Sequence, residues 1–466
     1  MNSRRLIALL PLALAACALG PSYQRPDIAI PAGYKEAAPG WEAAAPADAT
    51  DRGPWWSWFG DPQLNALADQ VAVSNQNIAA AVANYAQARA LVRVQRASYF
   101  PSLGLSGGVT RTGRPGGVSN NVQVSLGTSW EPDVWGRLSN GVAAADASAQ
   151  ASEADLASAR LAAQGELAVN YFSLRAADAE LELLRSTVEG LERSQQIAQN
   201  RYASGVVAKS DVLQAQTQLA NTKADLLALQ NQRAQLEHAI ALLVGKAPAD
   251  FSVPPAAEWK PIALDVPLLV PSTLLQRRPD IAATERDVAA ANAQIGIQRA
   301  AYFPSLSLSG SYGRSSSTVS DLFSASNALW SLGVSVAQTL FDAGATTARV
   351  EGAQAARDVA IARYRQTVLT AFQSVEDQLS TVRTLAAQET LRREASTAAD
   401  DVERQVINRY RSGQVSYTEV VTAQASALSA RRALLQLLAS RQTTSVALIQ
   451  AMGGGWQAEG TAAAQK

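Results

Sequence analysis

Apolar residues in this chain follow two different spacings, which alternate along its length. In residues 102–111, 121–131, 305–313 and 329–340, apolar side chains recur at about every second position, with mainly serine, glycine or alanine between them. This period of two indicates β-strands with one apolar face and one small or polar face. Residues 138–200 contain no proline, and their apolar positions recur every seven residues. That spacing predicts very long helices packed as coiled coils.

One stretch of sequence occurs twice, at the start of each strand region. Ala97–Gly107 (ASYFPSLGLSG) returns as Ala300–Gly310 (AAYFPSLSLSG), an offset of 203 residues. Proline has no amide hydrogen to donate and disfavours helix in the residue before it, so a change from helix to strand is predicted at Pro101 and again at Pro304. The long helical patterns after the strands also recur. The chain therefore consists of two predicted structural repeats.

These repeats divide the chain into six expected segments. They are a signal peptide (1–16), an N-terminal arm (17–62), a first repeat (63–250), a linker (251–270), a second repeat (271–452) and a C-terminal tail (453–466). Each repeat should hold a helix, two strands and a helical hairpin. The expected strands and hairpin are residues 102–111, 121–131 and 138–245 in the first repeat, and 305–313, 329–340 and 343–450 in the second.

The connections between these elements can also be predicted. Polar residues should form loops over 112–121 and 313–329, joining the two strands of each pair. Before the first strand pair, the chain should be helical from Gln63 to about Ser98.

The N-terminus has the pattern of a bacterial export signal. Two arginines precede the apolar run Leu6–Ala16, which is too short to span a bilayer. The run ends in Leu-Ala-Ala-Cys17, which resembles the lipobox of bacterial lipoproteins, where the cysteine becomes the acylated (palmitate-bearing) first residue of the mature protein. The alternative is a cysteine without a role in a discarded signal peptide. Because Cys17 is the only cysteine, no internal disulfide can form.

Composition excludes several function classes. The chain has 40 Lys+Arg and 40 Asp+Glu, so its net charge of zero gives no indication of nucleic-acid binding. It has one histidine, and no nucleophile–base set, metal-ligand cluster or phosphate-binding glycine loop is recognisable. We therefore expect no enzymatic activity and no cofactor. After the signal, no stretch of eighteen apolar residues follows, so an exported chain that belongs in a membrane would have to cross it as strands.

Four strands are too few to close a barrel by themselves. An open sheet edge in hydrocarbon leaves backbone groups unpaired, at a cost of several kcal/mol each. Two copies would give a narrow barrel filled by its own side chains, whereas three copies would give twelve strands around a pore. The small residues on one face favour the pore, and hence a cyclic trimer. The alternative is an ordinary antiparallel sheet with one face buried, which shows the same alternation.

Several motifs together resemble the OprM/NodT branch of the TolC-like outer-membrane factors. They are Gly20-Pro21-x-Tyr23-x-x-Pro26, Trp55-Trp56 with Phe59-x-Asp61-Pro62, Arg277-Arg278-Pro279-Asp280-Ile281, the two Tyr-Phe-Pro-Ser-Leu segments, and Phe341-Asp342-x-Gly344. The resemblance implies an α+β membrane protein: a trimeric 12-stranded transmembrane β-barrel, with four strands per chain, continued by a long coiled-coil α-barrel in the periplasm and a mixed equatorial collar. The implied role is the outer-membrane exit duct of a tripartite efflux pump for drugs or other small molecules. Its implied partners are a periplasmic adaptor and an inner-membrane transporter of the resistance-nodulation-division type.

The resemblance also implies site residues near the turns of the two helical hairpins. Asp211, Glu419 and Tyr410 match positions that form and hold the constricted periplasmic gate. Thr422 and Val415 depart from the acidic and basic residues of some relatives, so the ion pairing of the gate is expected to be weaker or differently placed. Both acids could instead be ordinary first-turn residues, stabilised by the helix N-terminus by about 0.3–1 kcal/mol. The tips expected to contact the adaptor are Arg201, Gly205, Arg409 and Gly413.

Two other functions fit parts of the pattern. A periplasmic adaptor also uses a long helical hairpin, but it would have one hairpin and no lipid-facing strands. An outer-membrane channel of a type I protein secretion system would share the whole duct, because the inner-membrane partner selects the cargo. The lipobox favours small-molecule efflux over protein secretion.

Overall fold

The computed structural model describes residues 20–31, 33–36, 54–256, 259, 261–262 and 278–454. The predicted signal peptide and Cys17 lie outside these residues, as does most of the predicted linker. The chain forms two compact units: one within residues 1–28, 83–154 and 281–367, the other within 29–82, 155–280 and 368–466. We describe each unit separately.

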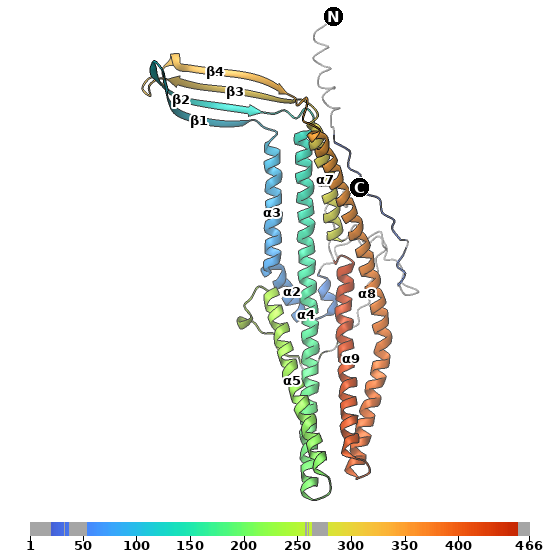
Figure 1. The fold of residues 1–466 in the computed structure, drawn as a ribbon. Coiled ribbons are helices and arrows are strands. Elements are labelled where there is room, and N and C mark those ends of the chain that lie inside the picture. The colour runs from blue at the N-terminus through green and yellow to red at the C-terminus, as the bar shows by residue number, and fades with distance from the viewer. Residues whose placement is uncertain are drawn as a thin grey trace. The chain divides into compact units, whose positions relative to one another are not determined.

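The first unit contains one antiparallel sheet in the order β1-β2-β3-β4, with the strands side by side (Figure 1). Leu105 lies opposite Leu126, Leu126 opposite Tyr312, and Tyr312 opposite Trp330, so these side chains share one face. The pairing of β2 with β3 joins the strand pairs of the two predicted repeats. The strands span Ser102–Arg114 (β1), Gly117–Trp130 (β2), Ser305–Ser316 (β3) and Ala328–Ala337 (β4).

The connections within the strand pairs are shorter than predicted. The loop expected over 112–121 is wrong: β1 continues to Arg114 and β2 begins at Gly117, so only Pro115 and Gly116 form the turn. Gly116 has φ +113°, a conformation that a residue with a side chain rarely adopts. The sequence pattern was misleading because these strands are exposed, so polar side chains do not mark their ends. The second loop, expected over 313–329, is reduced to 317–327 and contains the short 3-10 helix η4 (Ala325–Asn327).

The helices repeat with matching lengths. α3 and α7 each have 22 residues, α4 and α8 each have 67, and α5 and α9 each have 35. None of the helices in the described part of the chain is both long and apolar enough to cross a membrane. The bounds are Pro62–Ser74 (α2), Gln76–Ala97 (α3), Arg137–Ala203 (α4), Lys209–Leu243 (α5), Pro279–Ala300 (α7), Ala345–Arg411 (α8) and Tyr417–Ala451 (α9), with the 3-10 helices η2 (Trp55–Phe59) and η3 (Pro248–Asp250).

The helical region predicted from Gln63 to about Ser98 is present but divided, because Asn75 is extended and separates α2 from α3. Its side-chain oxygen accepts hydrogen bonds from the amides of Asn77 (3.0 Å) and Ile78 (3.1 Å), which caps the start of α3. Its Nδ2 donates to the carbonyl of Leu243 at the end of α5 (2.9 Å). Asn75 therefore satisfies backbone groups at two helix ends, and this compensates for the break.

The core of the second unit follows the predicted seven-residue spacing. The predicted heptad residues of α4 are all buried, and α5 and α9 supply Leu229 and Leu428 to the same cluster. Val368, Val375 and Leu379 of α8 are buried as well. The predicted heptad spacing is thus confirmed for α4, whereas in α5 and α8 some predicted positions, such as Leu226 and Val382, are only partly buried. The buried heptad residues of α4 are Leu167, Leu174, Leu181, Leu184, Val188 and Leu191.

Candidate functional site

The two helical hairpins turn in the same way at their tips. Gly205 and Gly413 both have φ +74°, and nothing within 4 Å would meet a side chain at either position. The Gly205 amide donates to the carbonyl of Tyr202 (2.9 Å), and the Gly413 amide donates to that of Tyr410 (3.0 Å). Both glycines are exposed, and they are required by the left-handed geometry that ends the helix.

The arginines at the two tips are not equivalent. Arg409 is exposed, whereas Arg201 is partly buried and donates from Nη1 to the carbonyl of Tyr410 (3.1 Å). The Arg201 guanidinium also lies over the Tyr410 ring, 4.7 Å from its centre. Arg201, predicted from sequence as an adaptor contact, therefore connects the end of α4 to the end of α8.

Tyr410 belongs to a buried cluster at the ends of four helices. Its ring meets that of Tyr417 edge to face, with centres 5.4 Å apart, and both pack with Ala198, Ala215 and Val420. Neither tyrosine hydroxyl has a hydrogen-bond partner within the described residues. Burial, with smaller effects of Tyr410 and Asp211, raises the pKa of Tyr417 to about 12, and burial also raises the pKa of Tyr410. Both phenols are therefore neutral at physiological pH.

Tyr417 was missed from the sequence. The first-repeat residue at its place is Lys209, so the internal repeat gives no matching aromatic residue there. The one available signal was an aromatic residue at the first position of α9, close to the turn at Gly413.

The two predicted gate acids have different surroundings. Each is the third residue of its helix, Asp211 in α5 and Glu419 in α9. Glu419 is exposed and forms a capping box with Ser416, whose amide donates to Glu419 Oε1 (3.4 Å). Asp211 is partly buried, and its charge acts on Tyr410 and Tyr417. The structure therefore brings Asp211 to the tyrosine cluster and places Glu419 at the start of α9.

The sheet has two chemically distinct faces, as its alternation predicted. Large apolar side chains of all four strands share one face, among them Leu105, Leu126, Tyr312 and Trp330, all exposed. The other face is formed mainly of serine and glycine. Facing serines bond across the strands in the pairs Ser102–Ser129 (2.9 Å), Ser106–Ser125 (2.8 Å), Ser307–Ser335 (2.6 Å) and Ser311–Ser331 (2.8 Å).

The two outer strands of this sheet each have one partner in the chain. β1 pairs only with β2, and β4 only with β3, within the described residues. The outer edges of β1 and β4 therefore present backbone N–H and C=O groups to which a further strand could bind.

A buried ion network in the second unit had no recognisable signal in the sequence. Asp178 of α4 accepts hydrogen bonds from Arg175 (3.0 Å) and from Arg233 of α5 (2.6 Å). Arg175 also donates to the carbonyl of Pro254 (2.8 Å), and Arg233 to that of Val253 (2.7 Å). The network fixes the segment after η3 against α4 and α5.

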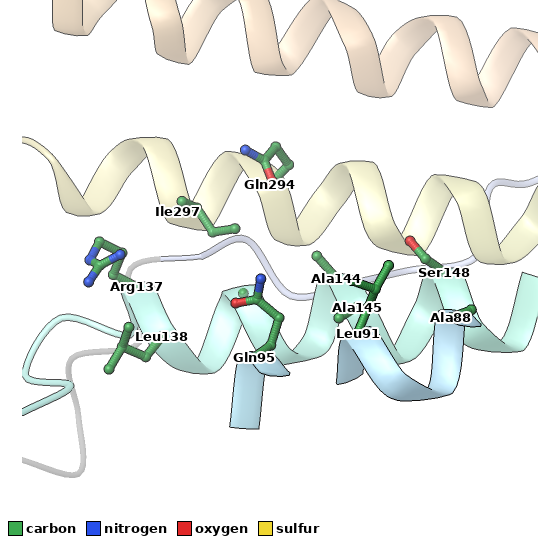
Figure 2. A pocket seen from close by; sticks show the side chains of 11 residues that line it. Ala88, Leu91, Gln95, Arg137, Leu138, Ala144, Ala145, Ser148, Gln294 and Ile297 are labelled. Carbon is green, nitrogen blue, oxygen red and sulfur yellow. The ribbon is translucent and has the colours of Figure 1, made fainter. Parts of the chain in front are cut away.

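The first unit has a cavity of about 450 Å³ between α3, α4 and α7. Figure 2 shows side chains from all three helices along it, among them Leu91 and Gln95 of α3, Arg137 of α4 and Ile297 of α7. The Arg137 guanidinium is already bonded to Glu131 (Nη2 to Oε2, 2.7 Å). This lining holds no acid–base pair. Over the described part of the chain, no group of three or more metal-ligating side chains exists either.

Comparison with known proteins shows a match along nearly the whole chain. The sequence model of the family described as "outer membrane efflux protein" matches residues 67–246 and 270–454. The probable efflux pump outer membrane protein TtgC of Pseudomonas putida KT2440 is 32% identical over 97% of this chain and 95% of its own. The cation efflux system protein CusC of Escherichia coli O6:H1 (strain CFT073) is 30% identical over 96% of this chain and 97% of its own. The outer-membrane channel OprN superposes with a TM-score of 0.86 at 31% identity, over 95% of this chain and 100% of that one.

These findings confirm the fold class predicted from the sequence, that of the trimeric TolC-like channels with long helices and four strands per chain. The family model matches the chain in two segments, and these correspond to the two repeats. The chain therefore belongs to the outer membrane efflux protein family.

Proposed function

We propose that three copies of this chain form a passive exit duct through the outer membrane, for drugs or other small molecules. The observation that carries the proposal is the sheet: four strands, two open edges, one apolar face and one face of serine and glycine. Three such sheets joined edge to edge, β4 of one copy beside β1 of the next, would pair the free backbone groups. The apolar faces would then meet lipid, and the serine faces would line the pore.

The long helices supply the periplasmic part of this duct. The heptad spacing that buries leucines of α4 against α5 also leaves much small alanine surface on neighbouring helices, which suits side-by-side packing in a ring. The partners in the proposal are a periplasmic adaptor and an inner-membrane transporter of the resistance-nodulation-division type. The transporter supplies the energy for export, because a passive duct has no energy source of its own. The exposed tips at Arg409, Gly205 and Gly413 are the proposed adaptor contacts, with Arg201 holding the two hairpins together behind them.

The proposed gate consists of the tyrosine cluster and the two acids. Tyr410 and Tyr417 pack the ends of the hairpins together, and Arg201 fixes Tyr410 from α4. Three copies of Asp211 and Glu419 would surround the periplasmic mouth with negative charge, which attracts cations and disfavours anions. Opening would require the cluster to separate.

Removing these charges tests both the pore and its gate. The wild-type protein, purified in detergent, is expected to open cation-selective pores in planar lipid bilayers. Glu419→Ala with Asp211→Ala is expected to raise the single-channel conductance, because shorter side chains widen the constricted mouth, and to lower the cation selectivity, because the negative charge is lost. Because Glu419 also caps α9, Glu419→Gln with Asp211→Asn is the matched variant: glutamine keeps the capping hydrogen bond and removes only the charge.

The two variants separate charge from helix capping. If selectivity changes in the alanine variant alone, the capping box and not the charge controls the mouth. Absence of any pore from the wild-type protein would contradict the duct itself.

We also propose that Cys17 carries the lipid, on the evidence of the Leu-Ala-Ala-Cys pattern. Cys17→Ser removes the thiol to which the lipid is attached, so incorporation of radioactive fatty acid should be lost. The barrel should still insert, because its strands lie more than eighty residues away along the chain. Heat-sensitive trimer bands on a gel would report insertion. Continued labelling of the serine variant would contradict the assignment.

A further inference from the structure

The connections within the two strand pairs differ greatly in length. Between β1 and β2 there are only Pro115 and Gly116, whereas residues 317–327 connect β3 to β4. We call residues 317–327 the β3–β4 loop. The proposed duct would carry three copies of this loop and three tight turns at the same end of the barrel.

The β3–β4 loop has a defined internal structure. The Asp321 carboxylate accepts a hydrogen bond from the Thr318 hydroxyl (2.8 Å), and the Asp321 carbonyl accepts one from Asn327 Nδ2 (2.7 Å). Leu322 is 4% exposed although it lies in a surface connection. The loop therefore folds onto the sheet as a small ordered element.

Two observations show which face of the sheet it covers. Arg314 lies opposite Val124 and so projects from the apolar face, and its Nη1 donates to the carbonyls of Phe323 (2.5 Å) and Ser324 (2.8 Å). Val122, on the same face, is the one strand residue in the described sheet that is buried (8% exposed), while Val109 beside it is 72% exposed. The loop therefore bends over the apolar face, not over the serine face.

Two large apolar side chains lie on the outer surface of the loop, among exposed serine, threonine and aspartate residues. Val319 and Phe323 are 69% and 73% exposed, and Asp321 is its only charged residue. Tyr312 and Trp330, paired with each other on the apolar face, are also exposed. Arg314, which binds the loop, is two residues from Tyr312 on the same face. The exposed apolar side chains of the loop therefore lie next to the apolar face of the sheet, at the end where β3 and β4 are connected.

From this geometry we propose that the β3–β4 loop is a membrane anchor, with Phe323 and Val319 inserted among the lipids of the outer leaflet. The inference rests on the proposed function, because it takes the apolar face to be the lipid-facing one. Aromatic and aliphatic side chains at the level of the head groups add buried apolar area and fix the depth of a barrel in its membrane. Arg314 is the positioning residue, because its bonds to the two loop carbonyls hold the loop against the sheet.

Site-directed spin labelling tests the anchor. Cys17 is the only native cysteine and is proposed to be acylated, so a nitroxide can be attached to one introduced cysteine, with the unmodified parent as the control for background labelling. Three variants are compared in lipid vesicles: Phe323→Cys, Pro115→Cys at the tight turn, and Leu105→Cys on the apolar face. For each, accessibility to oxygen, which partitions into lipid, is measured against accessibility to a water-soluble nickel chelate.

The label at 323 is expected to behave like that at 105, with oxygen the stronger relaxant, and unlike that at 115. A label at 323 that matches 115 would place the loop in water and overturn the anchor. A label at 323 shielded from both reagents would place it against protein, and would overturn the anchor as well. If the label at 105 is also in water, the proposed duct fails, and the anchor fails with it; the failure of the anchor alone leaves the label at 105 in lipid.

Discussion

Replacement of Asp178 by alanine is expected to lower the free energy of unfolding by about 3–5 kcal/mol, the effect of removing one partner from a buried ion pair. The Asp178 side chain is 2% exposed, and it accepts hydrogen bonds from Arg175, Arg233 and the amide of Ala256 (3.2 Å). Without the carboxylate, the Arg175 guanidinium, 5% exposed, loses its anionic partner, whereas Arg233 keeps its ion pair with Glu237 (3.4 Å). Denaturant unfolding of the detergent-solubilised protein measures the change.

The same helix offers a matched control. Glu182 pairs with Arg185 at 3.6 Å, but both side chains are about half exposed. Glu182→Ala should therefore cost less than about 1 kcal/mol, the usual value for surface pairs. Limited proteolysis gives a second measurement, because the segment at Val253–Ala256 should be cut faster in Asp178→Ala only. Equal losses of stability in the two variants would contradict the role assigned to the network.

Periodicity in the sequence was sufficient for the elements whose environment is uniform along their length. The heptad leucines of α4 are buried because a coiled coil presents one continuous seam to its neighbours. The strands begin at Ser102 and Ser305 because Pro101 and Pro304 end the preceding helices in both repeats. The apolar and serine faces follow from strict alternation. These features depend on local spacing, which can be recognised in a single sequence.

Features that depend on contacts between distant segments could not be predicted in this way. The break at Asn75 is stabilised by a bond to Leu243, more than one hundred and fifty residues away. Arg201 was expected to face a partner but bonds to the Tyr410 carbonyl, because the second hairpin lies within its reach. No sequence motif marks Asp178, because ion pairs between helices have no fixed sequence spacing. The roles of Asp211, Glu419 and the tip residues in gating and docking remain predictions.

Gly245 is the position where we expect the second large loss of stability. It follows α5 with φ +69°, and its amide donates to the carbonyl of Leu242 (3.1 Å). A Cβ atom there would overlap the carbonyl oxygen of Ser74 and lie 3.1 Å from its carbonyl carbon, directly before the break at Asn75. Gly245→Ala should thus combine about 1–2 kcal/mol for the left-handed backbone with about 1–3 kcal/mol for overpacking against backbone that cannot easily move.

Gly205→Ala separates these two contributions. Gly205 has nearly the same backbone angle, φ +74°, but nothing within 4 Å of its Cβ position. It should therefore show only the backbone cost of about 1–2 kcal/mol. If denaturant unfolding gives equal losses for the two variants, the contact with Ser74 does not constrain the end of α5. A larger loss for Gly245→Ala would instead support the conclusion that the end of α5 is fixed by the break between α2 and α3. At this break the glycine leaves room for the Ser74 carbonyl, and the Asn75 side chain binds the carbonyl of Leu243.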